Sequence, residues 1–156
     1  MGRRRIAEKL WQALLILSFA VWWGGLTFYA MVVVPIGTQQ IGSVEQGFIT
    51  QKVTRWHNSA LTIMTTCLLL EAWRRKRRTL WIVSGALAVI NLSLLFSHSH
   101  LTAMLDFNNY QVSDNFYQAH AIYLWLTTVE WLLGLSVPLL VWQISPSESE
   151  PVSPSM

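Results

Sequence analysis

The sequence "RRKRR", residues 74–78, decides how this chain folds, because five consecutive cations separate two long apolar segments. Residues 57–73 precede the basic run and residues 79–101 follow it, and two further apolar segments lie at residues 11–34 and 116–142. A helix of about 20 apolar residues crosses the hydrocarbon core of a bilayer. The pattern therefore predicts an all-α fold, built as a four-helix transmembrane bundle.

The composition agrees with a membrane location. Hydrophobic residues make up 53% of the chain and charged residues only 12%, whereas soluble domains carry about 25% charged residues. So few charges cannot cover a water-facing surface, and we expect the lipid bilayer to be the main partner. The formal net charge of +3 is too small to indicate nucleic-acid binding.

The distribution of Lys and Arg among the short loops predicts the orientation, because cytoplasmic loops of membrane proteins are enriched in these residues. The N-terminus carries arginines at positions 3–5 and Lys9, and the loop at residues 74–78 is wholly basic. The loop between the first two segments holds only Lys52 and Arg55, and the loop between the last two holds neither Lys nor Arg. Both termini and the basic loop are therefore predicted to be cytoplasmic.

Tryptophan placement supports this orientation, since indole rings favour the headgroup level of a bilayer. The predicted cytoplasmic ends of the four segments each carry one: Trp11, Trp73, Trp81 and Trp142. The membrane domain is expected to cover residues 1–144. Residues 145–156 are rich in Ser, Pro and Glu, cannot bury apolar area, and are expected to form a disordered cytoplasmic tail.

The four histidines of the chain all fall at the predicted outer ends of the segments: His57, His98, His100 and His120. Asn91 and His98 are seven residues apart and lie on nearly one helix face, whereas His100 points about 200° away from His98. We therefore expect His57, His98 and His120 to approach one another, with His100 turned elsewhere. Neutral imidazole binds haem iron and copper, so the four histidines form a candidate metal site. The alternative is that they are interfacial histidines, satisfied by loop carbonyls or water.

Glu130 lies near the middle of the last apolar segment, where a carboxylate is costly unless it is paired, protonated or hydrated. Tyr123 and Thr127 precede it at helical spacing and predict that this face turns into the bundle. Asn91 and Thr127 are the expected partners of the carboxyl group. Glu130 is therefore either a proton carrier, connected to the outside by His120, Tyr123 and Thr127, or a protonated acid that joins two helices.

Several local patterns predict details of the helices. "SVEQ", residues 43–46, has the pattern of a capping box and predicts a short amphipathic helix on the outer surface, before the second apolar segment. Pro138 is expected to kink the last helix. Glu71 precedes the basic run and is expected to form an ion pair with it. Gly24 and Gly25 are expected to allow close helix packing.

The sequence "VWWGGLTFYAMVVVP", residues 21–35, resembles the first helix of a set of small four-helix bacterial membrane proteins that share a W-x-x-G-L-x-F/Y pattern. The set includes the copper-resistance-D-type membrane domains, the HemJ-type protoporphyrinogen oxidases and several uncharacterised families. "YQAHAIYLW", residues 117–125, resembles the opening of their last helix. The resemblance implies a multi-pass protein of the bacterial plasma (inner) membrane, whose histidine-lined bundle binds haem b or copper.

Two departures limit what the resemblance implies. HemJ-type proteins carry a histidine in the first helix before the Trp-x-x-Gly pattern, where this chain has "ALLILSFA", residues 13–20. The methionine-rich metal loops of the copper-resistance proteins are also missing. Protoporphyrinogen oxidase activity is therefore not expected, and the chain is predicted to belong to an uncharacterised branch.

Three functions stay open from the sequence. The first is a protein with a metal, haem or other small-molecule site at the outer end of the bundle. The second is a proton-coupled transporter or redox partner that uses Glu130. The third is a structural or assembly subunit without catalysis, since no nucleotide-binding loop or nucleophile triad indicates an enzyme.

Overall fold

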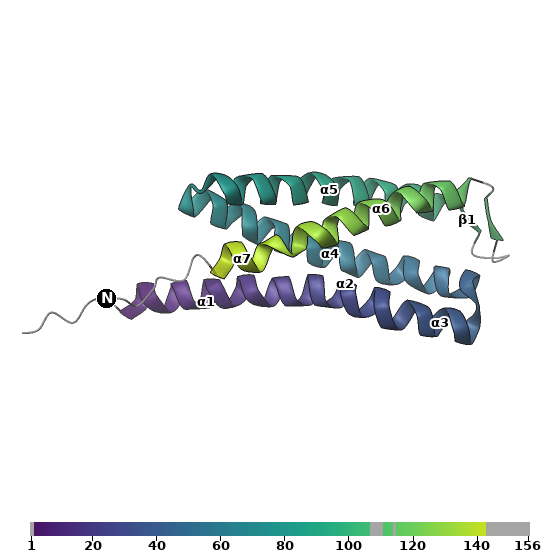
Figure 1. Cartoon of the computed structure of the whole chain (residues 1–156), viewed down its shortest axis with the longest axis horizontal. Coiled ribbons are helices and arrows are strands. Elements are labelled where there is room, and N and C mark those ends of the chain that lie inside the picture. Colours follow the sequence, from purple (N-terminus) through teal and green to yellow (C-terminus); the bar gives the residue numbers. More distant parts are fainter. Residues whose placement is uncertain (1, 107–110, 114, 143–156) are drawn as a thin grey trace, which may run out of the picture.

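The computed structural model describes residues 2–106, 111–113 and 115–142 (Figure 1). These residues form four long helical segments, which run in alternating directions, and one small β-hairpin. The all-α prediction is confirmed for the four segments. The predicted disordered tail, residues 145–156, lies outside the described residues.

The first segment is one continuous helix that extends beyond the predicted residues 11–34 at both ends. It consists of α1 (Gly2–Phe19), η1 (Ala20–Gly24), α2 (Gly25–Phe28), η2 (Tyr29–Val33) and α3 (Val34–Ile41). The two η elements are π-helical turns, which are frequent at functional sites. The η2 turn directly precedes Pro35, whose ring removes a backbone donor and crowds the carbonyl four residues earlier. A wide turn gives that carbonyl room.

The second segment, α4 (Ser43–Arg75), is a single helix of 33 residues. The prediction of a separate outer helix is therefore wrong, because no proline or turn sequence interrupts the chain between residues 43 and 75. The predicted capping box is also wrong. Gly42 is the N-cap, with a φ of 96° that favours glycine, and no side chain caps the helix. The Gln46 side chain instead donates to the Tyr29 hydroxyl at 3.2 Å.

The third segment is α5 (Arg78–Ala103), and the last consists of α6 (Phe116–Gly134) and α7 (Ser136–Trp142). Leu135 separates α6 from α7. Pro138 lacks a backbone N–H donor, and its ring crowds the carbonyl group of Gly134, the last residue of α6. The break therefore agrees with the kink expected from Pro138.

A two-stranded antiparallel hairpin lies between α5 and α6. Its strands are β1 (Leu105–Asp106) and β2 (Gln111–Val112), with Leu105 opposite Val112 and Asp106 opposite Gln111. The sequence analysis did not predict this hairpin, because two-residue strands are too short to show an alternating pattern.

The two ends of the molecule carry different connections (Figure 1). The start of α1, the turn between α4 and α5, and α7 lie at one end, and the α3–α4 turn and the hairpin lie at the other. Antiparallel neighbours joined by short connections produce this alternation. The basic residues 74–78 and the basic N-terminus therefore lie at the same end of the molecule.

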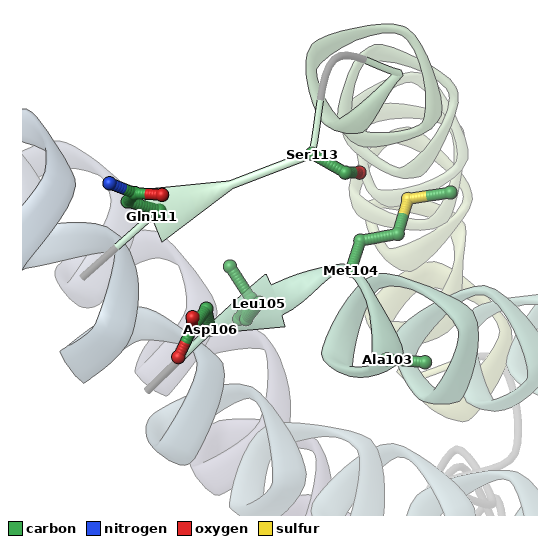
Figure 2. A pocket seen from close by; sticks show the side chains of 6 residues that line it. All are labelled: Ala103, Met104, Leu105, Asp106, Gln111 and Ser113. Atoms are coloured by element: carbon green, nitrogen blue, oxygen red, sulfur yellow. The ribbon is translucent and has the colours of Figure 1, made fainter. Parts of the chain in front are cut away.

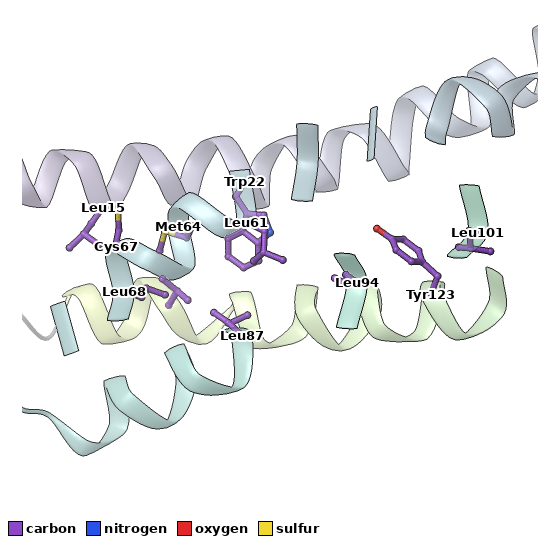
Figure 3. Close-up of a cluster of buried hydrophobic side chains, with 11 residues drawn as sticks. Leu15, Trp22, Leu61, Met64, Cys67, Leu68, Leu87, Leu94, Leu101 and Tyr123 are labelled. Atoms are coloured by element: carbon purple, nitrogen blue, oxygen red, sulfur yellow. The ribbon is translucent and has the colours of Figure 1, made fainter. Parts of the chain in front are cut away.

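The core runs along the inside of the four segments and is mostly apolar (Figure 3). All four segments contribute to it: Leu15, Trp22, Leu61, Met64, Cys67, Leu68, Leu87, Leu94, Leu101, Tyr123 and Val137. Large apolar side chains also cover the outside, and Phe96 and Trp125 are 76% and 72% exposed. An outer surface of this kind is costly in water and suits a lipid environment.

Three helical segments in the described part of the chain are long and apolar enough to cross a membrane: Gly2–Ile41, Arg78–Ala103 and Phe116–Val141. The fourth segment, α4, is not among them, although a crossing at residues 57–73 was predicted. Polar side chains that α4 buries against its neighbours lower its hydropathy: Gln46, Asn58, Thr65 and Glu71. The α4 helix thus contributes buried polar groups to the inside of the molecule.

Candidate functional site

A buried polar contact joins three of the helical segments. Glu130 on α6 has 0% exposed surface, and its Oε1 atom accepts a hydrogen bond from Trp22 Nε1 at 2.5 Å. The same oxygen lies 3.2 Å from His57 Nε2 on α4. The structure therefore places Glu130 inside the molecule, with an indole and an imidazole as its polar neighbours.

The second carboxyl oxygen of Glu130, Oε2, is buried and has no hydrogen-bond partner among the described residues. Trp22 Nε1 can only donate, so Oε1 acts as an acceptor whatever the charge of the carboxyl group. A proton on Glu130 lies either on Oε2 or on Oε1, where it faces His57 Nε2 at 3.2 Å. When that proton is absent, a protonated His57 can neutralise the carboxylate, so the pair can hold a proton on either residue.

Two further buried residues extend this site toward the α3–α4 end of the molecule. The Tyr123 hydroxyl donates to Asn58 Oδ1 at 3.3 Å. Asn58 follows His57 in the sequence, and Tyr123 precedes Glu130 by seven residues and shares its helix face. The Asn58 Nδ2 group is buried without a hydrogen-bond partner in the described part of the chain. We call Trp22, His57, Asn58, Tyr123 and Glu130 the Glu130 site.

Aromatic packing between the first and last segments holds Trp22 in place. Trp23 stacks on Trp131 with ring centroids 5.3 Å apart, and Trp23 Nε1 donates to the Trp131 carbonyl oxygen at 3.1 Å. The Trp131 indole donates in turn to the Thr27 hydroxyl at 2.9 Å. Gly134 leaves room for both indoles of the η1 turn, because a Cβ there would lie 2.4 Å from Trp23 Cδ1 and 3.1 Å from Trp22 Cη2.

The close packing expected at Gly24 and Gly25 is not found. A Cβ added to either residue would meet no atom within 4 Å. Glycines that permit close approach are instead Gly134 on α6, beside Trp23, and Gly37 on α3, beside Gln46. Neither was predicted, because nothing in the local pattern distinguishes them. Which glycine lies at a helix contact depends on how the two helices are rotated about their axes.

The structure does not bring the histidines together. His98 Nδ1 lies 3.4 Å from Thr102 Oγ1 on its own helix, and His120 stacks on Phe116 with ring centroids 5.5 Å apart. Among the described residues, which include all four histidines, no three His, Cys, Asp or Glu side chains form a group that could hold a metal ion. The expected convergence of His57, His98 and His120 is therefore wrong. Binding of copper or haem b by fewer of these histidines stays a prediction.

The remaining predicted site residues have other partners. Asn91 is buried and donates to the Thr62 hydroxyl at 2.9 Å, so it joins α5 to α4. It is not a hydrogen-bond partner of Glu130, which contacts Trp22 and His57. Thr127 donates to the Tyr123 carbonyl oxygen on its own helix. His100 is exposed, in agreement with its helical phase. The partners expected for Glu130 were wrong because depth and helix face do not determine which neighbouring helix a side chain meets.

Sequence reasoning missed Trp22 and Asn58 as members of the Glu130 site. A signal for Trp22 was present, since it lies far from both ends of the first segment, and a buried indole needs a hydrogen-bond acceptor. Asn58 had no comparable signal, because an asparagine near a predicted helix end is ordinary. Its role depends on Tyr123, which another helix brings to it.

A second buried glutamate, Glu71, lies near the basic end of α4. It has 0% exposed surface and accepts a hydrogen bond from Trp11 Nε1 at 2.6 Å. It also forms ion pairs with Arg74 at 3.3 Å and Arg75 at 2.5 Å. The predicted ion pair with the basic run is confirmed, and Trp11 is an additional partner. Both oxygens of Glu71 are thus engaged, in contrast to those of Glu130.

A hollow of about 330 Å³ lies beside the hairpin (Figure 2). Its lining residues are Ala103, Met104, Leu105, Asp106, Gln111 and Ser113. The described residues of this lining include no predicted site residue, no histidine and no aromatic side chain. The Glu130 site therefore remains the strongest candidate for chemistry.

Comparisons with protein-family models, with curated proteins and with solved structures find no match. The resemblance to small four-helix bacterial membrane proteins therefore stays a prediction.

Proposed function

We propose that this chain is a four-helix integral membrane protein of the bacterial plasma membrane that binds and releases a proton at the His57–Glu130 pair, as a proton-coupled transporter or a proton-transfer subunit. One observation carries the proposal: a fully buried carboxyl group lies 3.2 Å from an imidazole and keeps one oxygen without a partner among the described residues. Ionisable groups inside membrane helices are costly and mark proton or substrate pathways.

The chemistry of the pair suits reversible protonation. A carboxylate and an imidazolium neutralise each other, and a carboxylic acid beside a neutral imidazole is also uncharged overall. Both states hold the same proton and differ only in which residue carries it. Release of that proton leaves a net negative charge on the pair, so release must be coupled to the entry of a cation or of a second proton. Tyr123 and Asn58 add a hydroxyl and an amide group between this pair and the α3–α4 end.

The orientation proposed for the protein places both termini and the basic 74–78 turn in the cytoplasm. The Lys and Arg asymmetry supports this placement. The test is labelling of Lys76→Cys in a Cys67→Ala background with a membrane-impermeant maleimide. We expect labelling only after the cells are permeabilised, whereas the control Gln40→Cys, near the α3–α4 turn, should react in intact cells. Labelling of position 76 from outside intact cells contradicts the orientation.

Infrared difference spectroscopy in lipid vesicles tests the proton-binding step without a known substrate. We expect the C=O stretch of a protonated carboxylic acid to appear and disappear reversibly when the pH is changed. Glu130→Gln should abolish this change and still fold, because the amide oxygen can accept the Trp22 hydrogen bond. Glu8→Gln is the matched control, since it removes an exposed carboxylate from α1. A pH-dependent band that survives in Glu130→Gln would falsify the assignment.

A second candidate function is structural, and a specific observation favours it. Two tryptophans of the first segment donate hydrogen bonds to glutamates of other helices: Trp11 to Glu71 on α4, and Trp22 to Glu130 on α6. If Glu130 only holds helices together, its carboxyl group stays in one protonation state. The infrared band would then be unchanged at every pH, and Glu130→Gln would preserve both folding and function.

A further inference from the structure

A groove lies between α4 and α5. It has a volume of about 340 Å³ and is lined by Leu95 and by six polar residues: Arg55, Asn58, Ser59, His98, Ser99 and Thr102. The polar residues of each helix recur at spacings of three or four and therefore share one face. We call this hollow the α4–α5 groove.

Arg55 gives the groove a positive charge that no described carboxylate neutralises. The ion pairs within the described part of the chain involve Glu71 and Glu130, and none involves Arg55. Arg55 lies close enough to His98 for the guanidinium charge to act on the imidazole. The groove thus combines the permanent charge of Arg55 with the polar imidazole of His98, and it favours an anion.

Asn58 adds an unused donor to the inner wall of the groove. The residue is 1% exposed, its Oδ1 atom accepts the Tyr123 hydrogen bond, and its Nδ2 atom has no partner among the described residues. A buried N–H group without an acceptor is costly, and it is satisfied when a ligand oxygen enters. Ser59 and Ser99 are exposed, and their hydroxyl groups donate to the carbonyl oxygens of Arg55 and Phe96. They reach a ligand only by exchanging these hydrogen bonds.

The depth of the groove matches a lipid headgroup. Arg55 precedes Arg74 by 19 residues on α4, and His98 follows Arg78 by 20 residues on α5. At about 1.5 Å per residue these separations are about 29 Å and 30 Å, close to the thickness of a bilayer hydrocarbon core. If the basic 74–78 turn lies at one headgroup level, the groove lies at the other.

We infer that the α4–α5 groove is a binding site for a phosphate group, which Arg55, His98 and Asn58 hold between the two helices. A guanidinium fork binds two phosphate oxygens at once, and the further donors match the remaining oxygens of a tetrahedral anion better than those of a planar carboxylate. The phosphate belongs either to a phospholipid of the outer leaflet or to a free phosphate ion. The partly exposed Leu95 supplies an apolar rim, which suits a lipid.

This site goes beyond the proposed proton chemistry and does not depend on it. Only the lipid form of the inference needs the membrane placement proposed above. Glu130→Gln should leave phosphate binding unchanged, because Glu130 does not line the groove. Loss of the infrared signal and loss of phosphate binding are therefore separate outcomes.

Two measurements on the full-length protein separate the sources of the phosphate. Native mass spectrometry from mixed micelles counts the phospholipids that stay bound at increasing collision energy. Isothermal titration of delipidated protein with sodium phosphate, and with sodium succinate for comparison, measures free-anion binding. A retained phospholipid supports the lipid form, and saturable phosphate binding without a retained lipid supports the free ion.

The variants test the named residues. Arg55→Gln should weaken binding at least tenfold, whereas Lys52→Gln, which removes one charge from an exposed position outside the groove, should bind like the wild type. Ser99→Leu fills the groove without changing a charge and should also abolish phosphate binding. This variant therefore tests whether phosphate binds in the groove even if Arg55→Gln does not fold. The inference is overturned if the wild type binds neither form of phosphate, if succinate binds more tightly, or if Ser99→Leu binds like the wild type.

Discussion

Replacing Trp22 by Phe tests how strongly the buried indole holds the Glu130 carboxyl group. Trp22→Phe keeps an aromatic ring and removes the Nε1 donor that lies 2.5 Å from Glu130 Oε1. A hydrogen bond to a charged group contributes about 1.5–3 kcal/mol, and one between neutral groups about 0.5–1.5 kcal/mol. The smaller ring also leaves a void of roughly 40 Å³ in the core, which costs about 1 kcal/mol. We therefore expect the free energy of unfolding to fall by about 2–4 kcal/mol.

The matched control is Trp23→Phe, which removes the same atoms one residue later. Its Nε1 group donates to the backbone carbonyl of Trp131, a neutral acceptor, and its ring is only half-buried. The expected loss is about 1–2 kcal/mol. The difference between the two variants contains the contribution of the carboxyl group and the larger void at the fully buried Trp22.

The assay is reversible unfolding of the purified protein in mixed micelles, followed by circular dichroism, for Trp22→Phe, Glu130→Gln and the double variant. The double-mutant cycle measures the coupling between the two side chains. Glutamine still accepts the indole hydrogen bond, so the coupling energy reports the charge of Glu130. The reasoning is refuted if the coupling is below about 0.5 kcal/mol and Trp22→Phe costs no more than Trp23→Phe.

Three further changes test the packing and the pairing. Gly134→Ala should destabilise the protein by about 1–3 kcal/mol through overpacking against the indoles, whereas Gly25→Ala, with open space around it, should be neutral or stabilising in the same unfolding assay. Glu71→Gln removes the negative charge that pairs with Arg74 and Arg75. We expect the unfolding midpoint to fall, and to fall less at high salt, because salt already weakens these ion pairs in the wild type. His57→Phe removes the counter-ion of the buried carboxyl group, so the infrared band of the protonated acid should persist when the pH is raised; a band that still responds to pH argues against the pair.

The positions of the helices follow largely from local sequence. Long apolar stretches, the basic run at residues 74–78 and Pro138 determine where the segments lie and where the chain turns or breaks, because these effects need no information about a neighbouring helix. The boundaries were predicted less well. The first segment continues past Pro35 to Ile41, because the wide η2 turn accommodates the proline, and α4 begins at Ser43, since backbone hydrogen bonding extends a helix past its apolar part when no breaker follows.

What the sequence determined by itself is therefore the helical class, the approximate position of each segment, the ion pair of Glu71 with the basic run, and the unusual character of a carboxyl group at position 130. Only the tertiary structure decided which groups meet. Trp23 stacks on Trp131, and both indoles fit against Gly134, which has no Cβ. These contacts set the rotation and axial position of the first segment relative to the last, so that Trp22 reaches Glu130. The histidines lie on α4, α5 and α6, and the packing of these helices brings no three of them into one metal-holding group among the described residues. Helical periodicity describes the faces of one helix, whereas the contacts of a side chain depend on the rotation of two.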